Sequence, residues 1–207
     1  MTMTPHRPFP VFSRILHWTM AVLVLAMLFI GIGMVSSVSA YHQLVAIHKP
    51  LGILVLILVA IRLVNRLINP PPPLPEGMPP WQRFAALGSH VLLYILMFAV
   101  PIVGWAMLSA ARYPVVLYGA LQLPPIMPQN PELFAVLRQT HTVLALLLFA
   151  TFLAHFGAAL MHALIFRDDV FPSMTFWGLR TERVGGTSSD RDGRAQIAAS
   201  PALAKSE

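Results

Sequence analysis

The stretch "QTHTVLALLLFATFLAHFGAALMH" (Gln139–His162) is apolar, yet it contains the three histidines His141, His155 and His162. On an α-helix, the fourteen residues from His141 to His155 rise by about 21 Å and return to within roughly 40° of the same face. Ionisable side chains are costly inside a membrane and usually serve a function there. The stretch therefore predicts a membrane helix with functional groups at two depths of one face.

The chain as a whole is also strongly apolar. Of its 207 residues 57% are hydrophobic and only 11% are charged, and the mean hydropathy of +0.69 is too high for an ordinary soluble domain. A bilayer-spanning helix needs roughly 20 apolar residues. Four stretches qualify, approximately Ile15–Val35, Leu44–Val64, Ala85–Ser109 and Thr142–Phe166. We therefore predict an all-α fold, a four-helix transmembrane bundle in a multi-pass membrane protein.

Lysine and arginine sort to one side of these spans. Eleven of the fourteen lie before the first span, around the connection from the second to the third, or after the fourth. Only Lys49, Arg112 and Arg138 lie on the other side. By the positive-inside rule both termini are cytoplasmic, and the first and third spans run outward. Since the basic charge follows topology in this way, we expect no nucleic-acid partner.

One domain is expected. We expect a single transmembrane domain that contains the four spans; the family resemblance described below implies the bounds 8–177 for it, which leaves the segment 181–207 outside. That segment, "TERVGGTSSDRDGRAQIAASPALAKSE", is polar and rich in small residues. Such a composition cannot bury enough apolar surface to offset the entropy cost of folding, so we predict a disordered cytoplasmic tail.

Histidines on other spans match the two depths set by the fourth. His17 lies one turn into the first span from the cytoplasmic end, near the depth of His155. His48 opens the second span from the outside, near the depth of His141. The depths therefore predict two pairs, each with one imidazole from each of two helices. Pairing His162 with His17 is the alternative that depth alone leaves open.

Two imidazoles at each of two levels suit haem iron better than zinc. Zinc sites take four close ligands, normally three or more of them from protein. Two axial nitrogens on opposite faces of a porphyrin complete six-coordinate haem iron, and bundle cores hold such cofactors between facing helices. The chain has no cysteine, so covalent c-type attachment is excluded. The predicted iron ligands are His17, His48, His141 and His155.

Three further residues are candidates near the inner level. Arg62 lies fourteen residues after His48, so it returns to nearly the same face. Guanidinium binds carboxylates bidentately, which makes Arg62 a candidate partner for a haem propionate; the alternative is an arginine that snorkels to the interface. His90 and His162 are candidates to contact a quinone or a propionate. The alternatives are a histidine bonded between helices and one in the head-group region.

Four segments resemble the bacterial cytochrome b561 family. They are "RILHW" (Arg14–Trp18), "IHKPLG" (Ile47–Gly52), "HVLLYILMFAVPIVGW" (His90–Trp105) and "THTVLALLLFATFLAHFGAALMHALIFRDD" (Thr140–Asp169). The likeness covers roughly Pro8 to Trp177 and includes the histidines in order. It implies an inner-membrane protein with two non-covalent b-type haems that exchanges electrons with the quinone pool. The family's ligand positions match the four histidines that depth alone pairs.

The resemblance implies two distinct roles. One branch is similar to superoxide oxidases, oxidoreductases that pass electrons from periplasmic superoxide to ubiquinone; another redox protein is an alternative periplasmic donor. Related bundles are cytochrome b subunits that anchor a partner dehydrogenase or hydrogenase. The bare four-span layout favours the stand-alone role. A third hypothesis, with no haem, is a transporter or scaffold that uses histidines for packing or proton relay.

Overall fold

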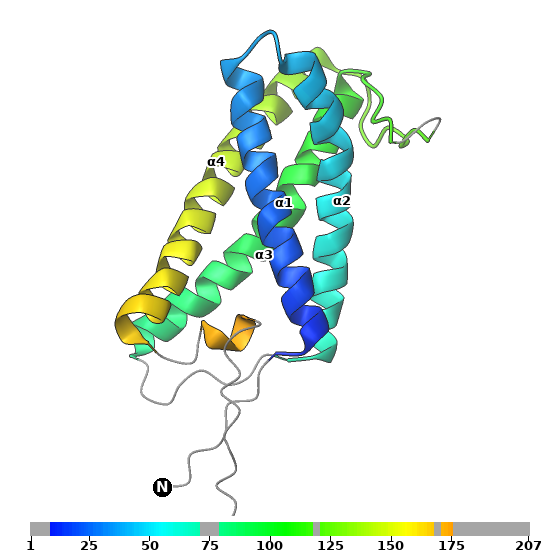
Figure 1. Cartoon of the computed structure of the whole chain (residues 1–207). Helices are drawn as coiled ribbons and strands as arrows, with labels where there is room; N and C mark the ends of the chain where they lie inside the picture. The colour runs from blue at the N-terminus through cyan, green and yellow to red at the C-terminus, as the bar shows by residue number, and fades with distance from the viewer. Residues whose placement is uncertain (1–8, 71–78, 118–120, 168–170, 176–207) are drawn as a thin grey trace, which may run out of the picture. The chain divides into compact units, whose positions relative to one another are not determined.

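The computed structural model describes residues 9–70, 79–117, 121–167 and 171–175. Four long helices dominate: α1 (Val11–Ser36), α2 (Tyr41–Ile68), α3 (Pro80–Ala110) and α4 (Pro131–Met161) (Figure 1). A π-helical turn, η1 (His162–Phe166), continues α4, and a short 3-10 helix, η2 (Pro172–Met174), follows. Each of the four is long and apolar enough to span a membrane. The predicted all-α four-helix bundle is confirmed, while the predicted tail 181–207 lies outside the described residues.

The helices are longer than the spans predicted from hydropathy. The largest difference is at α4, which begins at Pro131 rather than at Thr142. Asn130 caps this helix, because its side chain accepts a hydrogen bond from the backbone N–H of Leu133 at 3.0 Å, and Pro131 suits the first helical position. An apolar run marks only the part of a helix that lies within the hydrocarbon of the membrane. A helix whose cap lies outside the membrane is therefore longer than its apolar run.

Packing joins the helices mainly as α1 with α2 and α3 with α4, and α2 also packs on α3. One buried residue from each helix forms the central core: Val24, Val55, Leu96 and Leu148. Leu148 lies seven residues from both His141 and His155, which is about 10 Å along the helix in each direction. An apolar layer therefore separates the two histidine levels.

Both ends of the bundle contain an arginine in the left-handed conformation. After α3, Arg112 has φ 59°, and hydrogen bonds from Arg112 N to Ser109 O and from Tyr113 N to Leu108 O close the helix end. After η1, Arg167 has φ 52°. Glycine is the usual residue at such a helix end, because a Cβ is strained there.

The segment Phe171–Thr175 lies against the start of α1. Arg14, a buried charged residue of α1, donates from Nη1 to the carbonyl of Thr175 at 3.1 Å. The indole N–H of Trp18 donates to the carbonyl of Met174 at 2.9 Å. Hydropathy could not predict this segment, since its contacts are side-chain bonds to backbone carbonyls far away in the sequence.

Candidate cofactor sites

Two histidine pairs lie between α2 and α4 and between α1 and α4. In the first, which we call the outer pair after the predicted topology, the ring centroids of His48 and His141 are 6.3 Å apart and the ring planes are 75° apart. In the second, the inner pair, the centroids of His17 and His155 are 6.5 Å apart and the planes 77° apart. The structure thus brings together the residues that the depth argument pairs.

These separations fit one metal ion between the rings of each pair. An imidazole nitrogen binds a transition metal at about 2.0 Å, as it does zinc, so two rings on opposite sides of one ion have centroids roughly 6 Å apart. Rings in ordinary van der Waals contact can approach more closely. His90, whose centroid is 5.2 Å from that of His155, shows such a closer contact.

The outer pair has the hydrogen bonding expected of a metal-binding histidine. The Nδ1 of His141 lies 3.0 Å from the carbonyl oxygen of Val100. A carbonyl only accepts, so Nδ1 carries the proton and Nε2 has a free lone pair. His48 Nδ1 is buried without a hydrogen-bond partner in the described part of the chain. A buried nitrogen in this state needs an acceptor or a metal.

Gly104 on α3 lets the outer pair form. A Cβ built at this glycine would lie 3.1 Å from Cε1 and 3.3 Å from Nδ1 of His141. The imidazole therefore packs directly on the glycine backbone, and an alanine would have to displace the ring. At none of the other glycines that the structure describes would a Cβ come within 4 Å of a histidine ring.

At the inner pair, a cationic side chain contacts the histidine where the outer pair has a backbone carbonyl. Arg62 Nη2 donates to His17 Nδ1 at 2.9 Å, and Arg62 Nε donates to the hydroxyl of Tyr94 at 3.2 Å. Guanidinium cannot accept a hydrogen bond, so His17 Nδ1 is the acceptor. The neutral ring then carries its proton on Nε2, so iron binding through Nε2 requires that proton to move to Nδ1 and Arg62 to turn away from it. The surroundings of the two pairs therefore differ in kind.

Of the other candidates, two lie at the inner pair. Arg62 contacts His17 directly, and His90 packs edge-on against His155. His162 begins η1, and its ring is 5.2 Å from that of Phe166. The π-helical turn changes the helical register at this point, so extrapolation of the α-helical face from His155 does not fix where His162 points.

Sequence reasoning missed Tyr94 and Trp18 near the inner pair. The hydroxyl of Tyr94 holds Arg62, and the ring of Trp18 meets that of His17 edge-on at 5.6 Å. Trp18 directly follows a ligand candidate, and Tyr94 lies one turn after His90 on α3. Those spacings were the available signals, although aromatic residues in a membrane helix are too common to be informative alone.

Comparison with known proteins identifies the family of the chain. The family model described as prokaryotic cytochrome b561 matches residues 8–177. The chain belongs to the prokaryotic cytochrome b561 family. Members of this family bind b-type haem and transfer electrons across the membrane. The chain is therefore a multi-pass protein of the bacterial inner membrane.

Individual members of the family are similar over most of the chain. Cytochrome b561 homolog 2 of Escherichia coli (strain K12) is 33% identical over 177 residues, which cover 84% of this chain and 93% of the relative. A protein of Yersinia pestis named probable superoxide oxidase CybB is 30% identical over 62% of this chain and 72% of its own length.

Proposed function

We propose that this cytochrome carries electrons between two b-type haems, from a periplasmic donor to ubiquinone. His48 and His141 would bind the outer haem, and His17 and His155 the inner haem. The single observation that carries the proposal is that both pairs have the ring separation of two imidazoles on one metal ion, 6.3 and 6.5 Å. Each haem, when bound, takes up and releases one electron at a potential tuned by its axial ligands and surroundings.

The residues of the chain would hold the two sites apart and closed. If the two histidines of a pair both held the iron of a bound haem, no iron position would be left open to oxygen, which would favour electron transfer over oxygen chemistry. The core layer at Val24, Val55, Leu96 and Leu148 fills the space between the levels. The 14-residue spacing on α4 corresponds to about 21 Å between the His141 and His155 backbones.

Superoxide is the donor that we propose first. Lys49 directly follows His48, and Arg112 lies two residues after the last residue of α3. Both are exceptions to the concentration of positive charge on the other side of the membrane. Cations near an entry point raise the local concentration of an anionic reactant. The relative from Yersinia pestis, named a probable superoxide oxidase, supports the same donor for this chain.

Ubiquinone is proposed as the acceptor, near the inner pair. Arg62 and His90 both contact a member of this pair, and His162 lies farther along the same helix as His155. Each can donate a hydrogen bond to a quinone carbonyl. Arg62 is at the same time the candidate to bind a propionate of the inner haem.

The test is superoxide-driven reduction of ubiquinone by the purified single chain in liposomes. We expect haem reduction followed by quinol formation, both abolished when superoxide dismutase is added. Haem reduction without quinol would contradict the proposed acceptor. Activity that depends on a co-purifying dehydrogenase or hydrogenase subunit would instead establish the membrane-anchor role.

A further inference from the structure

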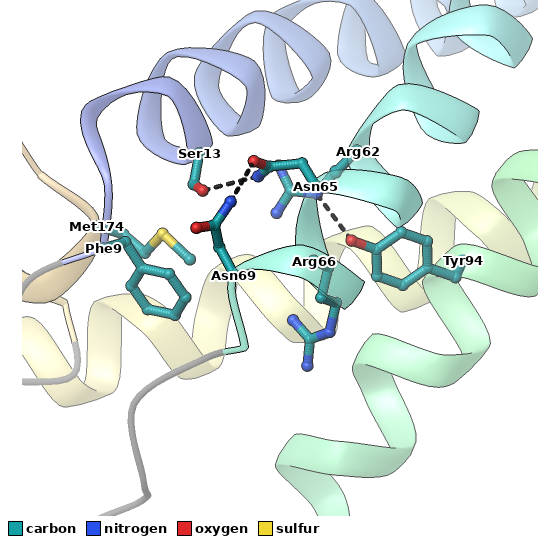
Figure 2. A pocket seen from close by; sticks show the side chains of 8 residues that line it. All are labelled: Phe9, Ser13, Arg62, Asn65, Arg66, Asn69, Tyr94 and Met174. Carbon is teal, nitrogen blue, oxygen red and sulfur yellow. Dashed lines mark hydrogen bonds between the residues drawn. The ribbon is translucent and has the colours of Figure 1, made fainter.

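A pocket at the end of α2 has cationic and polar walls (Figure 2). Its polar lining comes from Ser13, Arg62, Asn65, Arg66, Asn69 and Tyr94. None of the lining side chains is acidic, so the two guanidinium groups face the pocket without a carboxylate from its walls. The lining therefore has a positive charge that a ligand would have to balance.

The asparagines of the pocket are bonded to neighbours in the protein. Asn65 Nδ2 donates to the hydroxyl of Ser13 at 2.7 Å, and Asn69 Nδ2 donates to Asn65 Oδ1 at 3.0 Å. This chain of hydrogen bonds fixes one wall and ties α1 to the last turns of α2. The wall is thus held in place by the protein itself, as a binding site requires.

One donor of the pocket lacks an acceptor. Arg62 Nη1 is buried and has no hydrogen-bond partner among the described residues. The Tyr94 hydroxyl accepts from Arg62, which leaves its own hydrogen to be donated. Arg66 lies over the ring of Tyr94, with Cζ 5.9 Å from the centroid. A buried donor without a partner is costly. Arg62 Nη1, the Tyr94 hydroxyl and the half-buried Arg66 guanidinium together offer donors that oxygen atoms of an anion would satisfy.

The depth of the pocket identifies the kind of anion. Asn69 directly follows the last residue of α2, and Arg62 lies seven residues earlier, which is about 10 Å along the helix. The pocket thus extends inward from the helix end, where head groups meet the hydrocarbon. Basic pockets between membrane helices on the cytoplasmic side bind phosphate head groups. Phe9 and Met174 add apolar surface opposite the arginines.

We propose that this pocket binds the phosphate of an anionic phospholipid from the leaflet at this end of the bundle, with Arg66 and Tyr94 as its principal donors. Because Arg62 lines the pocket and also contacts His17, a bound anion offsets a positive charge beside the inner pair. The lipid composition of the membrane would then act on the inner site. The lipid site would be the same whether the chain binds one haem or two and whichever electron donor it uses.

The test is native mass spectrometry of the full chain in detergent with added phosphatidylglycerol. We expect one tightly bound lipid per chain in the wild type, with about tenfold weaker binding in Arg66→Gln and about threefold weaker binding in Tyr94→Phe. Arg138→Gln is the matched control, because it removes the same charge from an exposed position on α4 and should bind lipid as the wild type does. Diacylglycerol with the same acyl chains, which lacks the phosphate, should not compete.

Three outcomes would overturn the proposal. The first is wild-type affinity for phosphatidylglycerol in both Arg66→Gln and Tyr94→Phe. The second is binding of inorganic phosphate with the same dependence on Arg66 but no retention of the lipid, which would identify a free-phosphate site. The third is loss of haem absorbance in Arg66→Gln with lipid binding intact, which would assign the pocket to a haem carboxylate. If Arg66→Gln does not fold, Tyr94→Phe retains the ring and decides between these outcomes.

Discussion

The outer and inner histidine pairs have nearly the same ring separation, 6.3 and 6.5 Å, but opposite surroundings. At the outer pair, His141 donates a proton toward the carbonyl of Val100 and packs on Gly104. At the inner pair, His17 accepts from the cation Arg62. A carbonyl acceptor makes an imidazole more basic and stabilises oxidised iron, whereas a nearby cation stabilises the added electron. The difference indicates that ring geometry and electrostatic environment are set independently at the two pairs, and it is the difference expected if electrons run from outer to inner, as proposed above.

The largest expected effect distinguishes His155 from His90, whose ring packs against it. His155→Ala should remove roughly half of the reduced-minus-oxidised haem absorbance, because an axial ligand is lost. His90→Ala should retain all of it, since its ring lies only 5.2 Å from His155, closer than two ligands on one ion. Absorbance spectra of the purified variants at equal protein concentration decide this. Loss of haem in His90→Ala with retention in His155→Ala would reverse the assignment.

Removing the cation of the inner pair should change one potential only. Arg62→Gln takes away the positive charge 2.9 Å from His17 Nδ1, so the reduction equilibrium at the inner site should become roughly tenfold less favourable, which is about 59 mV for one electron. The outer potential should stay as it is. A spectroelectrochemical titration resolves the two. Equal changes in both potentials, or a rise at the inner site, would show that Arg62 does not distinguish the pairs.

A smaller change is expected from Gly104→Ala. The new Cβ would lie 3.1 Å from the His141 ring, so the ring must shift, and the outer haem should change its absorption band and be lost more readily to a haem acceptor protein. Gly157→Ala is the control, because a Cβ there meets nothing within 4 Å. Equal haem loss from the two variants would rule out a specific role for Gly104.

The smallest expected effect is a gain in stability when the left-handed arginine at either end of the bundle is replaced. Arg112→Gly and Arg167→Gly should each stabilise the protein by about 0.5–1 kcal/mol, because glycine avoids the left-handed strain but loses more entropy on folding. Chemical denaturation in detergent measures this. Arg112→Gln, which keeps the strained Cβ and removes the charge, should show no gain. If Arg112→Gln stabilised the protein as much as Arg112→Gly, the loss of the positive charge and not the relief of backbone strain would explain the gain.

Much of the fold was predictable because lipid restricts what a chain can do. Every backbone polar group must be satisfied inside the membrane, so a long apolar run is a helix, and a spacing of fourteen residues then fixes two depths on one face. The pairing of His48 with His141 follows from those depths and from the order of the helices. For His17 the depths left His155 and His162 open, and the structure places its ring beside that of His155.

The surroundings of the pairs could not be predicted in the same way. Contacts such as Arg62 with Tyr94 join α2 to α3, and the indole of Trp18 reaches a carbonyl of η2. They depend on how the helices are rotated against each other, which one sequence does not specify. The start of α4 was placed too late because Asn130 and Pro131 act outside the apolar run.

The most direct test of the central claim is the ratio of haem to protein chain, measured by pyridine haemochrome analysis, in the wild type, His141→Ala and His17→Ala. If the outer and inner pairs each hold one iron, the wild type contains two haems per chain and each variant contains one. The haem remaining in His141→Ala should have the inner potential, and that in His17→Ala the outer potential. A wild type with one haem, or either variant with two, would contradict the two-site account.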